Sequence, residues 1–268
     1  MNITLITGAL AGIGEAFARQ LAAEKYHLLL VARSESKLRL LCAELMAAYP
    51  ITAHYVALDL AQPGADQALW AETEKRGLAV DWLINNAGIG SGGDFLEYDL
   101  PSIQNLMHLN MDALVALTHR FLPPMRARRR GRILNVGSMA GFNPIPYMTV
   151  YAASKAFVQS FTEAIAEENR PFNIQAMLLC PGATETNFFA AARIGPDRKS
   201  SFSTKELETP QQVVAAALAG FRKGKTITIS GTQNKLARLL HFIPNSLITQ
   251  LFGKQMRANL KLNTAPAA

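Results

Sequence analysis

Residues 2–14 read NITLITGALAGIG, and this stretch decides the fold. The apolar run 2–7 is typical of a strand that is buried on both faces of a parallel sheet. Gly8, Gly12 and Gly14 follow it and open a segment in which apolar residues recur at helical spacing. In this context the glycines permit a tight turn, close approach of the backbone to a pyrophosphate, and close packing of helix on strand. The free N–H groups of such a helix end favour phosphate. The expected dinucleotide contacts are Gly8, Leu10, Ala11, Gly12, Ile13 and Gly14.

Strand and helix patterns alternate along the rest of the chain. The predicted helices are residues 15–25, 36–49, 66–76, 101–120, 150–168 and 210–221. The further predicted strands are residues 27–31, 52–58, 81–85, 132–136, 174–179 and 226–230. This alternation predicts an α/β fold, with a Rossmann-like doubly wound parallel sheet of seven strands and helices on both faces. We expect a single domain over residues 1–231, followed by a short helical C-terminal appendage over 232–268 that is not an independent domain.

Composition excludes several classes of protein. Apolar residues make up 49% of the 268 residues and charged residues 18%, which excludes a disordered chain. The two cysteines, Cys42 and Cys180, exclude a disulfide scaffold, and neither they nor the five histidines show metal-ligand spacing, so no metal site is expected. The first residues lack the pattern of a signal peptide, and no apolar run reaches the ~20 residues of a spanning helix. The expected location is the cytoplasm.

The net charge of +7 is unevenly distributed. The last 60 residues, 209–268, hold eight Lys and Arg and no acid. Apolar and basic residues alternate at helical spacing over 235–262, which predicts a basic amphipathic segment. Such a segment packs on the body or on a second subunit, or lies on a membrane surface as a peripheral contact. The run 126–132 holds five arginines but no aromatic residue, which favours a solvated turn, and no nucleic-acid partner is expected.

The end of the second predicted strand bears on the choice of cofactor. A site for NAD usually places an acidic residue there, to bind the ribose 2′-hydroxyl. This chain has Ala32 and then Arg33 at that point. A guanidinium can pair with a 2′-phosphate through two hydrogen bonds. NADP(H) is therefore favoured, while the nearby Glu35 keeps NAD(H) possible.

A tyrosine and a lysine stand where a predicted helix begins. Tyr151 and Lys155 are four residues apart and so lie on one helix face. A neighbouring cation favours the phenolate and lowers the pKa of a tyrosine. That shift would let Tyr151 exchange a proton with an alcohol or carbonyl oxygen.

Five motifs occur together and in a fixed order. They are Thr7–Gly14 as TGxxxGIG, Asn85–Gly88 as NNAG, Ser138, the YxxxK of Tyr151–Lys155, and Pro181–Gly182. In this combination the chain resembles the short-chain dehydrogenase/reductase family, in its single-domain NAD(P)-dependent type. The resemblance covers residues 2–231. It implies an oxidoreductase that transfers a hydride between nicotinamide and a carbonyl/secondary alcohol pair.

The resemblance also implies a role for each of four catalytic residues. Tyr151 would donate and accept the proton, and Lys155 would lower the pKa of Tyr151 and bind the nicotinamide ribose. Ser138 would bind the substrate oxygen, and Asn110 would hold a water that links Lys155 to solvent. The further cofactor contacts that it implies are Asp59, Leu60, Asn86, Ala87, Gly88, Tyr151, Lys155, Pro181, Gly182, Thr184 and Thr186. The resemblance implies a homodimer or homotetramer as well.

Residues around the predicted site are largely apolar and indicate the kind of substrate. They are Phe142, Ile145, Pro146, Tyr147, Met148, Phe188 and Phe189. They predict either an apolar pocket or ordinary core and subunit contacts, and the pocket would fit a lipophilic ketone, aldehyde or secondary alcohol of small to medium size. The polar loop 188–206 is expected to close over a ligand. Two alternatives stay open, a catalytically silent NADP-sensing protein and a membrane-associated lipid or steroid reductase. An epimerase would need a larger C-terminal domain.

Overall fold

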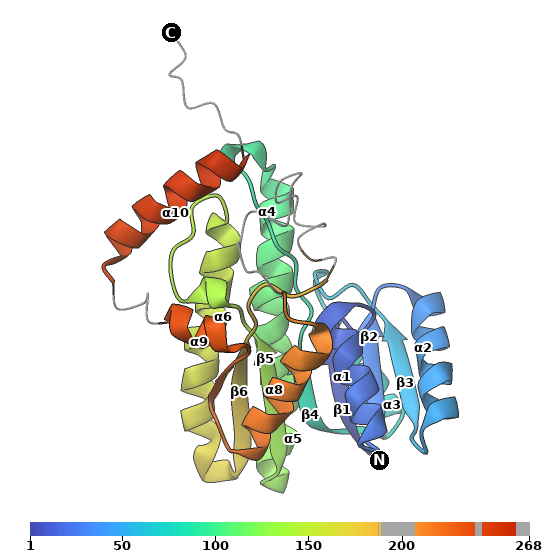
Figure 1. Ribbon diagram of the computed structural model, residues 1–268. Helices are drawn as coiled ribbons and strands as arrows, with labels where there is room; N and C mark the ends of the chain where they lie inside the picture. The colour runs from blue at the N-terminus through green and yellow to red at the C-terminus, as the bar shows by residue number, and fades with distance from the viewer. Residues whose placement is uncertain (187, 189–206, 239–242, 261–268) are drawn as a thin grey trace.

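One parallel sheet of seven strands forms the centre of the protein (Figure 1). The computed structural model describes residues 1–186, 188, 207–238 and 243–260. The strand order is β3-β2-β1-β4-β5-β6-β7. The strands are β1 (Asn2–Thr7), β2 (Leu28–Ala32), β3 (Ala53–Ala57), β4 (Ala79–Asn85), β5 (Gly131–Val136), β6 (Ile174–Cys180) and β7 (Ile227–Ile229). The fold class predicted from the sequence is confirmed, and every predicted strand is present within two residues of its expected bounds.

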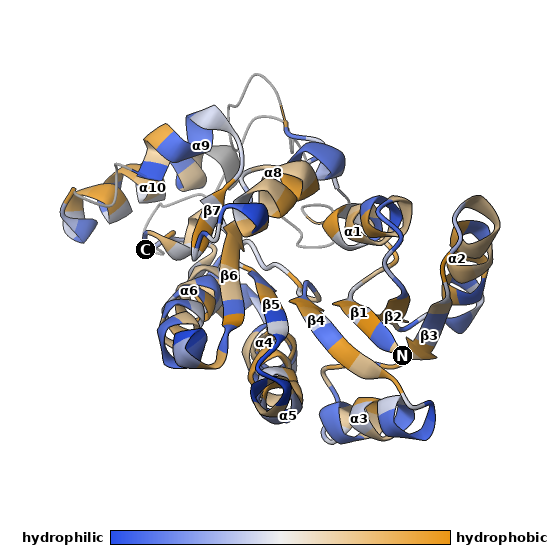
Figure 2. Cartoon of the chain, turned by 90° about the horizontal axis from the view of Figure 1, so that it is seen from below, coloured by the Kyte–Doolittle hydropathy of each residue, from blue (hydrophilic) through white to orange (hydrophobic). Residues whose placement is uncertain are grey.

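Helices cover both faces of the sheet (Figure 2). The helices and helical turns are α1 (Gly12–Ala23), α2 (Glu35–Ala48), α3 (Ala65–Lys75), η1 (Phe95–Glu97), α4 (Leu100–Met107), η2 (His108–Asp112), α5 (Ala113–Arg128), η3 (Met139–Gly141), α6 (Thr149–Asn169), η4 (Arg170–Phe172), α8 (Pro210–Arg222), α9 (Thr232–Ala237) and α10 (Asn245–Leu260). One buried apolar layer joins α1, α2 and α8 to the sheet, and a second layer joins α3 and α5 to its other face. The central strand β2 reads as an unbroken apolar run because both of its faces are buried.

The long helix predicted over residues 101–120 is instead two helices joined by a π-helical turn. The turn η2 carries Asn110 between α4 and α5. The Asn110 side chain is 2% exposed and hydrogen-bonds to the backbone of Ile89, outside the helix. The wider turn therefore brings a polar side chain inward, a common use of π-turns at functional sites.

A chain of buried polar side chains ties the helices to the centre of the sheet. Asn85 on β4 donates to Thr118 on α5 at 3.2 Å and to Asn135 on β5 at 2.9 Å. Asn135 in turn donates to Thr162 on α6 at 2.9 Å. Because buried polar groups are costly without partners, this chain fixes α6 relative to β4 and β5.

The carboxyl ends of β1 and β4 mark the point where the strand order reverses. β1 pairs with β2 on one side and with β4 on the other, so the connections after β1 and β4 diverge. In open α/β sheets, ligands bind in the crevice at this switch point. The glycine-rich turn after β1 and the Asn85–Gly88 segment after β4 both lie there.

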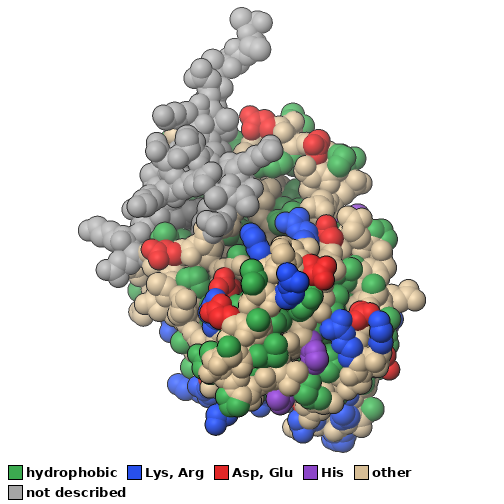
Figure 3. All heavy atoms as spheres, turned by 90° about the vertical axis from the view of Figure 1, so that its right-hand side faces the viewer, with side chains coloured by type: hydrophobic (Ala, Val, Ile, Leu, Met, Phe, Trp, Pro, Cys, Tyr) green, Lys and Arg blue, Asp and Glu red, His purple; other side chains and the backbone are tan. Residues whose placement is uncertain are grey.

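The C-terminal appendage contains α9 and α10. In α10, Ile248 and Met256 are each 3% exposed, and Met256 packs with Leu106 and Met148 of the body, whereas Leu247 and Leu251 are 57% and 63% exposed. No helix in the described ranges is long and apolar enough to cross a membrane. Figure 3 views the side of the molecule formed by α2 and β3, where basic and acidic side chains are interspersed.

Candidate active site

The glycine-rich turn after β1 has the geometry of a phosphate-binding turn. Gly8 and Gly12 adopt positive φ angles of 65° and 54°, which favour glycine. A Cβ on Gly14 would lie 2.2 Å from the carbonyl oxygen of Gly8, so α1 can approach the turn only with glycine there. Ala11 precedes α1 and provides no side-chain cap, which leaves the first N–H groups of the helix open to an anion. The turn therefore fits the pyrophosphate of a dinucleotide.

The NNAG segment is anchored to this turn through Thr7. The Thr7 hydroxyl accepts hydrogen bonds from the backbone N–H groups of Asn86 and Ala87, both at 2.9 Å. The Asn86 amide donates to the carbonyls of Thr7 and Gly8 at 2.9 and 3.2 Å. The Asn86 side chain thus serves the turn itself, and Ala87 and Gly88 follow it toward the site.

The segment after β6 lies over the same turn from the other side. A Cβ on Gly12 would come within 2.7 Å of Thr186 Cγ2. Thr184 is 5% exposed, and its hydroxyl donates to the carbonyl of Gly182 at 3.1 Å. Glu208 pairs with this segment through its backbone, and its carboxylate accepts from Ser230 at 2.8 Å. Pro181–Thr186 is therefore fixed at the mouth of the site.

The predicted adenine-side residues lie at the ends of β2 and β3. Arg33 is exposed, and no residue in the described ranges pairs with its guanidinium. Asp59 is half-buried and accepts a hydrogen bond from the N–H of Ala61 at 3.1 Å. The Leu60 side chain is 8% exposed and belongs to the apolar layer under the sheet, so only its backbone is available to a ligand.

Three predicted catalytic side chains converge where β5 ends and α6 begins. Tyr151 and Lys155 are both 6% exposed, and Lys155 Nζ lies 5.8 Å from the centre of the Tyr151 ring. Lys155 donates to the carbonyl of Val136 at 2.8 Å. Ser138 precedes the turn η3, and its hydroxyl accepts from the N–H of Ala140 at 3.1 Å. The phenol of Tyr151, the ammonium group of Lys155 and the hydroxyl of Ser138 therefore lie close together at the end of β5.

Burial shifts the two ionisable groups in opposite directions. Burial raises the pKa of Tyr151 to about 12, and a hydrogen bond with the Ser138 side chain opposes this rise. Burial lowers the pKa of Lys155 to about 8. The lower pKa of Tyr151 expected from its lysine neighbour is therefore not found in the protein chain itself, because burial disfavours the charged phenolate. Tyr151 is a protonated phenol at neutral pH, ready to donate.

Asn110 stands across from Lys155, with Gly88 between them. A Cβ on Gly88 would lie 3.1 Å from Asn110 Oδ1 and 3.6 Å from Lys155 Nζ. Asn110 also donates to the hydroxyl of Ser154 at 3.1 Å. Gly88 thus lies between the polar groups of Asn110 and Lys155, and the water relay between them stays a prediction.

An apolar cluster surrounds Tyr151. Met148, Met256 and Leu106 are buried in it, and Ile145, Tyr147 and Phe188 pack against it. The Phe188 ring lies 5.4 Å from that of Tyr151. Four of the predicted apolar residues thus gather near the site, namely Ile145, Tyr147, Met148 and Phe188. Phe142 is buried in a separate cluster, because its helical turn directs it toward α6 and β6. Phe189 and nearly all of the predicted loop 188–206 lie outside the described residues.

Sequence reasoning missed several residues that hold the site together. Thr7, Ser154 and Glu208 connect its segments through the hydrogen bonds described above, and Met256 joins the cluster around Tyr151 from α10. Ser154 follows Tyr151 at the i, i+3 spacing of a helix, a signal that could have found it. The others depend on contacts distant in sequence. Cys180 is buried and burial raises its pKa to about 12, as suits a core residue rather than a nucleophile.

Comparison with known proteins gives a consistent result. A family model described as short chain dehydrogenase matches residues 2–196. "Ketoacyl reductase HetN" from Nostoc sp. is 32% identical over 237 residues, covering 88% of this chain and 80% of that protein. "Very-long-chain 3-oxoacyl-CoA reductase-A" from Danio rerio is 31% identical over 80% of this chain, which spans 65% of the length of that relative.

A solved structure shows the same likeness over the whole chain. A short-chain dehydrogenase from Sphingobium yanoikuyae in complex with NADPH superposes with a TM-score of 0.79 and 29% sequence identity. The match covers 100% of this chain and 99% of that one. The helical C-terminal region is therefore included in the similarity.

Proposed function

The chain belongs to the short-chain dehydrogenase/reductase family, and we propose that it reduces a lipophilic ketone with NADPH, using Tyr151 as the proton donor. It is an oxidoreductase that acts on a CH–OH/C=O pair with a nicotinamide cofactor. Because the chain belongs to a class of enzymes, a catalytically silent NADP-sensing protein is the less favoured alternative. The substrate, the roles of individual residues and the preference for NADPH are parts of the proposal.

The observation that carries this proposal is the convergence of Tyr151, Lys155 and Ser138 at the end of β5, with Asn110 near Lys155 on the other side of Gly88. When bound, the nicotinamide supplies the hydride. Ser138 would bind the substrate oxygen and Tyr151 would donate its phenolic proton to that oxygen. Lys155 would stabilise the resulting phenolate, and a water held by Asn110 would return a proton toward Lys155.

The exposed Arg33 supports a preference for NADPH. Its guanidinium is free of protein partners in the described part of the chain, and the neighbouring Ala32 provides no carboxylate for a ribose hydroxyl. A 2′-phosphate would gain two charge-assisted hydrogen bonds from Arg33, whereas a 2′-hydroxyl would gain little. The solved relative that carries NADPH agrees with this choice.

The apolar cluster around Tyr151 supports a lipophilic substrate. Met148, Met256 and Phe188 would exclude water from the reacting carbonyl. The relatives named as a ketoacyl reductase and as 3-oxoacyl-CoA reductases point to 3-oxoacyl compounds as the first class to test. A 3-oxo ester offers the same ketone in an uncharged form.

An exposed aromatic side chain supports a homo-oligomer. Phe157 on α6 is 40% exposed and stacks on Phe161, with ring centres 6.0 Å apart. The family expectation places subunit contacts on α5 and α6, the helices before β5 and β6. Light scattering should therefore find a dimer or tetramer, and Phe157→Glu should shift it toward monomer.

The decisive experiment measures NADPH oxidation with ethyl 3-oxohexanoate. The Tyr151→Phe variant should lose turnover by about 10²–10⁴-fold, while its dissociation constant for NADPH, measured by fluorescence titration, stays within about twofold. Tyr49→Phe, at the far end of α2, is the matched control and should keep full turnover. Retention of turnover by Tyr151→Phe would overturn the proposed role of Tyr151.

A further inference from the structure

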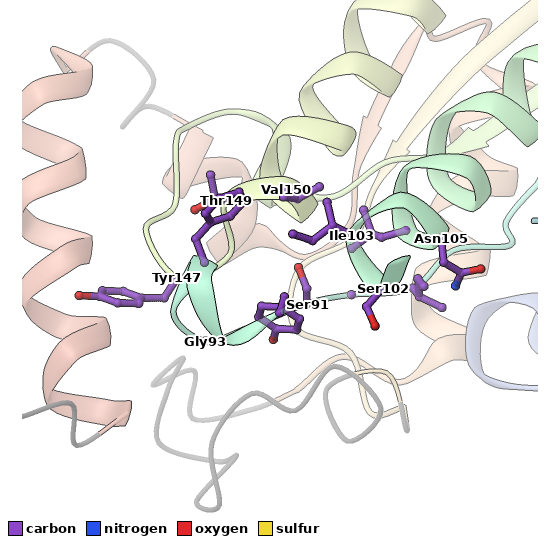
Figure 4. Close-up of a pocket in the computed structure, with 13 residues that line it drawn as sticks. Ser91, Gly93, Ser102, Ile103, Asn105, Tyr147, Thr149 and Val150 are labelled. Carbon is purple, nitrogen blue, oxygen red and sulfur yellow. The ribbon is translucent and has the colours of Figure 1, made fainter. Parts of the chain in front are cut away.

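A cavity lies beside the candidate site, outside the residues that carry the chemistry. It has a volume of about 200 Å³ and is bounded by α4, by the segment that follows β4 and by the start of α6 (Figure 4). At ~30 Å³ for each water-sized group, this volume accommodates about six or seven such groups. Ile103 on α4 and Val150 on α6 face each other across it.

The wall of this cavity is fixed by hydrogen bonds. The Tyr98 hydroxyl accepts from the N–H of Gly92 at 2.7 Å and donates to the carbonyl of the same residue. The N–H of Gly93 donates to the carbonyl of Tyr147 at 2.8 Å. Tyr147 holds a positive φ of 65°, a strained conformation for a residue with a side chain, and such strain clusters at functional sites. The cavity is therefore built into the fold rather than left by loose packing.

The same wall is shared with the candidate active site. Ile89, Leu106 and Val150 line the cavity and also belong to the apolar cluster around Tyr151. Val150 directly precedes Tyr151, and the backbone of Ile89 is held by Asn110. The cavity therefore adjoins the apolar cluster around the phenol, and a substrate bound at Tyr151 would lie next to it.

The chemistry of the lining indicates what fits. None of the lining residues, all of them in the described ranges, carries a charge. Ile89, Ile103 and Val150 provide an apolar side, while the hydroxyls of Ser91, Ser102 and Thr149 provide a polar one. An ionised group would lose its hydration here without gaining an opposite charge. An alkyl chain would be stabilised against the apolar side.

We propose that this cavity binds the distal, uncharged part of the substrate and so selects for its chain length. The proposal rests on the proposed ketone reductase function. It assigns to Ile103 and Val150 a role in specificity, because their side chains set the width of the cavity. It also predicts that a substrate ending in a carboxylate is rejected, although the reacting carbonyl is the same.

The test compares three 3-oxo esters of defined length and charge. They are ethyl 3-oxobutanoate, ethyl 3-oxodecanoate, and the monoethyl ester of 3-oxodecanedioic acid, which ends in a carboxylate. Because each buried methylene favours binding several-fold, the wild type should show a kcat/KM at least about tenfold higher for the decanoate than for the butanoate. The terminal carboxylate should remove most of that gain.

Two matched variants on α4 locate the effect. Ile103→Trp fills the cavity and should lower kcat/KM for the decanoate about tenfold or more, while the value for the butanoate stays within about twofold. Gln104→Trp places the same side chain on the exposed face of the helix, outside the cavity, and should leave both values unchanged. Ile103→Ala widens the cavity and should shift the preference toward longer chains.

The possible failures are distinguishable. If the wild type binds NADPH and turns over none of the three esters, the proposed function fails for this substrate class. If it turns over both neutral esters and Ile103→Trp leaves their ratio unchanged, the cavity does not bind the chain and only the further inference is wrong. Equal loss for both esters in Ile103→Trp would equally overturn the inference, since a chain-length site cannot affect the short ester.

Discussion

The side chain of Asn110 binds the backbone of Ile89 at two points. Asn110 Oδ1 accepts from the N–H of Ile89 at 2.9 Å, and Asn110 Nδ2 donates to the carbonyl of Ile89 at 2.9 Å. This pair joins the π-turn η2 to the segment that follows the NNAG motif. It places Asn110 in two roles, as a proposed holder of the relay water and as the anchor of the wall between site and cavity.

Replacing Asn110 with leucine should test both roles. Asn110→Leu leaves a partly buried donor and a partly buried acceptor of Ile89 unpaired, which should lower the free energy of unfolding by about 1–3 kcal/mol. We also expect turnover to fall more than tenfold. Asn110→Asp keeps the acceptor for the Ile89 N–H and should lose less stability. Urea unfolding and NADPH oxidation measure the two effects, and equal stability of the two variants would contradict the two-point contact.

Two glycines of the site should respond differently to alanine. At Gly14 a Cβ would lie 2.2 Å from the backbone oxygen of Gly8, so Gly14→Ala must displace α1 and should destabilise the fold and abolish NADPH binding. At Gly88 the Cβ would meet two side chains, Asn110 and Lys155, at 3.1 and 3.6 Å. Gly88→Ala should therefore fold almost normally but lose turnover. Thermal unfolding and turnover are measured for both variants. Wild-type turnover in Gly88→Ala would contradict the prediction for Gly88.

The pattern of the chain predicts the sheet well because its strands are buried on both faces. Residues 28–31 form an unbroken apolar run, for example, and the helical pattern of residues 36–49 follows them. The glycine turn is equally readable, since positive φ at Gly8 and Gly12 and the close approach at Gly14 demand glycine. Structure that is set by contacts between neighbouring residues can therefore be predicted from the local sequence.

Features set by distant contacts were harder to predict. The π-turn at Asn110 depends on Ile89, which lies 21 residues earlier, so the local helical pattern gives no sign of it. Phe142 turns into the core for a similar reason, because β6 and α6 offer it a closer apolar surface. The rise in the pKa of Tyr151 reflects burial, which the spacing of Tyr151 and Lys155 does not report.

The cofactor preference should be reversible at the end of β2. The double variant Ala32→Asp/Arg33→Ala supplies a carboxylate for a ribose 2′-hydroxyl and removes the partner of a 2′-phosphate. We expect its affinity for NADPH to fall about 10–100-fold, in line with the loss of charge-assisted hydrogen bonds, and its affinity for NADH to rise. Arg39→Ala removes one positive charge from the exposed face of α2 and serves as the control. Unchanged affinities for NADPH and NADH in the double variant would contradict the role of Arg33, and Glu35 would then be the residue to test.

Burial of the charged Lys155 should lower the free energy of unfolding of the protein at neutral pH. Its pKa is about 8 in the folded chain, below the ordinary 10.5, because burial disfavours the ammonium form. The unfolded chain therefore binds this proton more tightly, and stability rises with pH between about 8 and 10.5. Below pH 8 the full cost applies, about 3 kcal/mol from the size of the shift. The hydrogen bond of Lys155 to the Val136 carbonyl offsets part of it.

Lys155→Met should therefore stabilise the protein while abolishing turnover. At pH 7 we expect a gain of about 1–3 kcal/mol in the free energy of unfolding, since the methionine fills a similar volume without a charge. The gain should shrink as the pH rises from 8 toward 10.5, because the wild-type lysine is then already neutral in the folded state. Urea unfolding of both proteins at pH 7 and pH 9.5 measures this difference. A gain that is the same at both pH values would mean that Lys155 keeps an ordinary pKa, and that its role in binding the proton must be assigned anew.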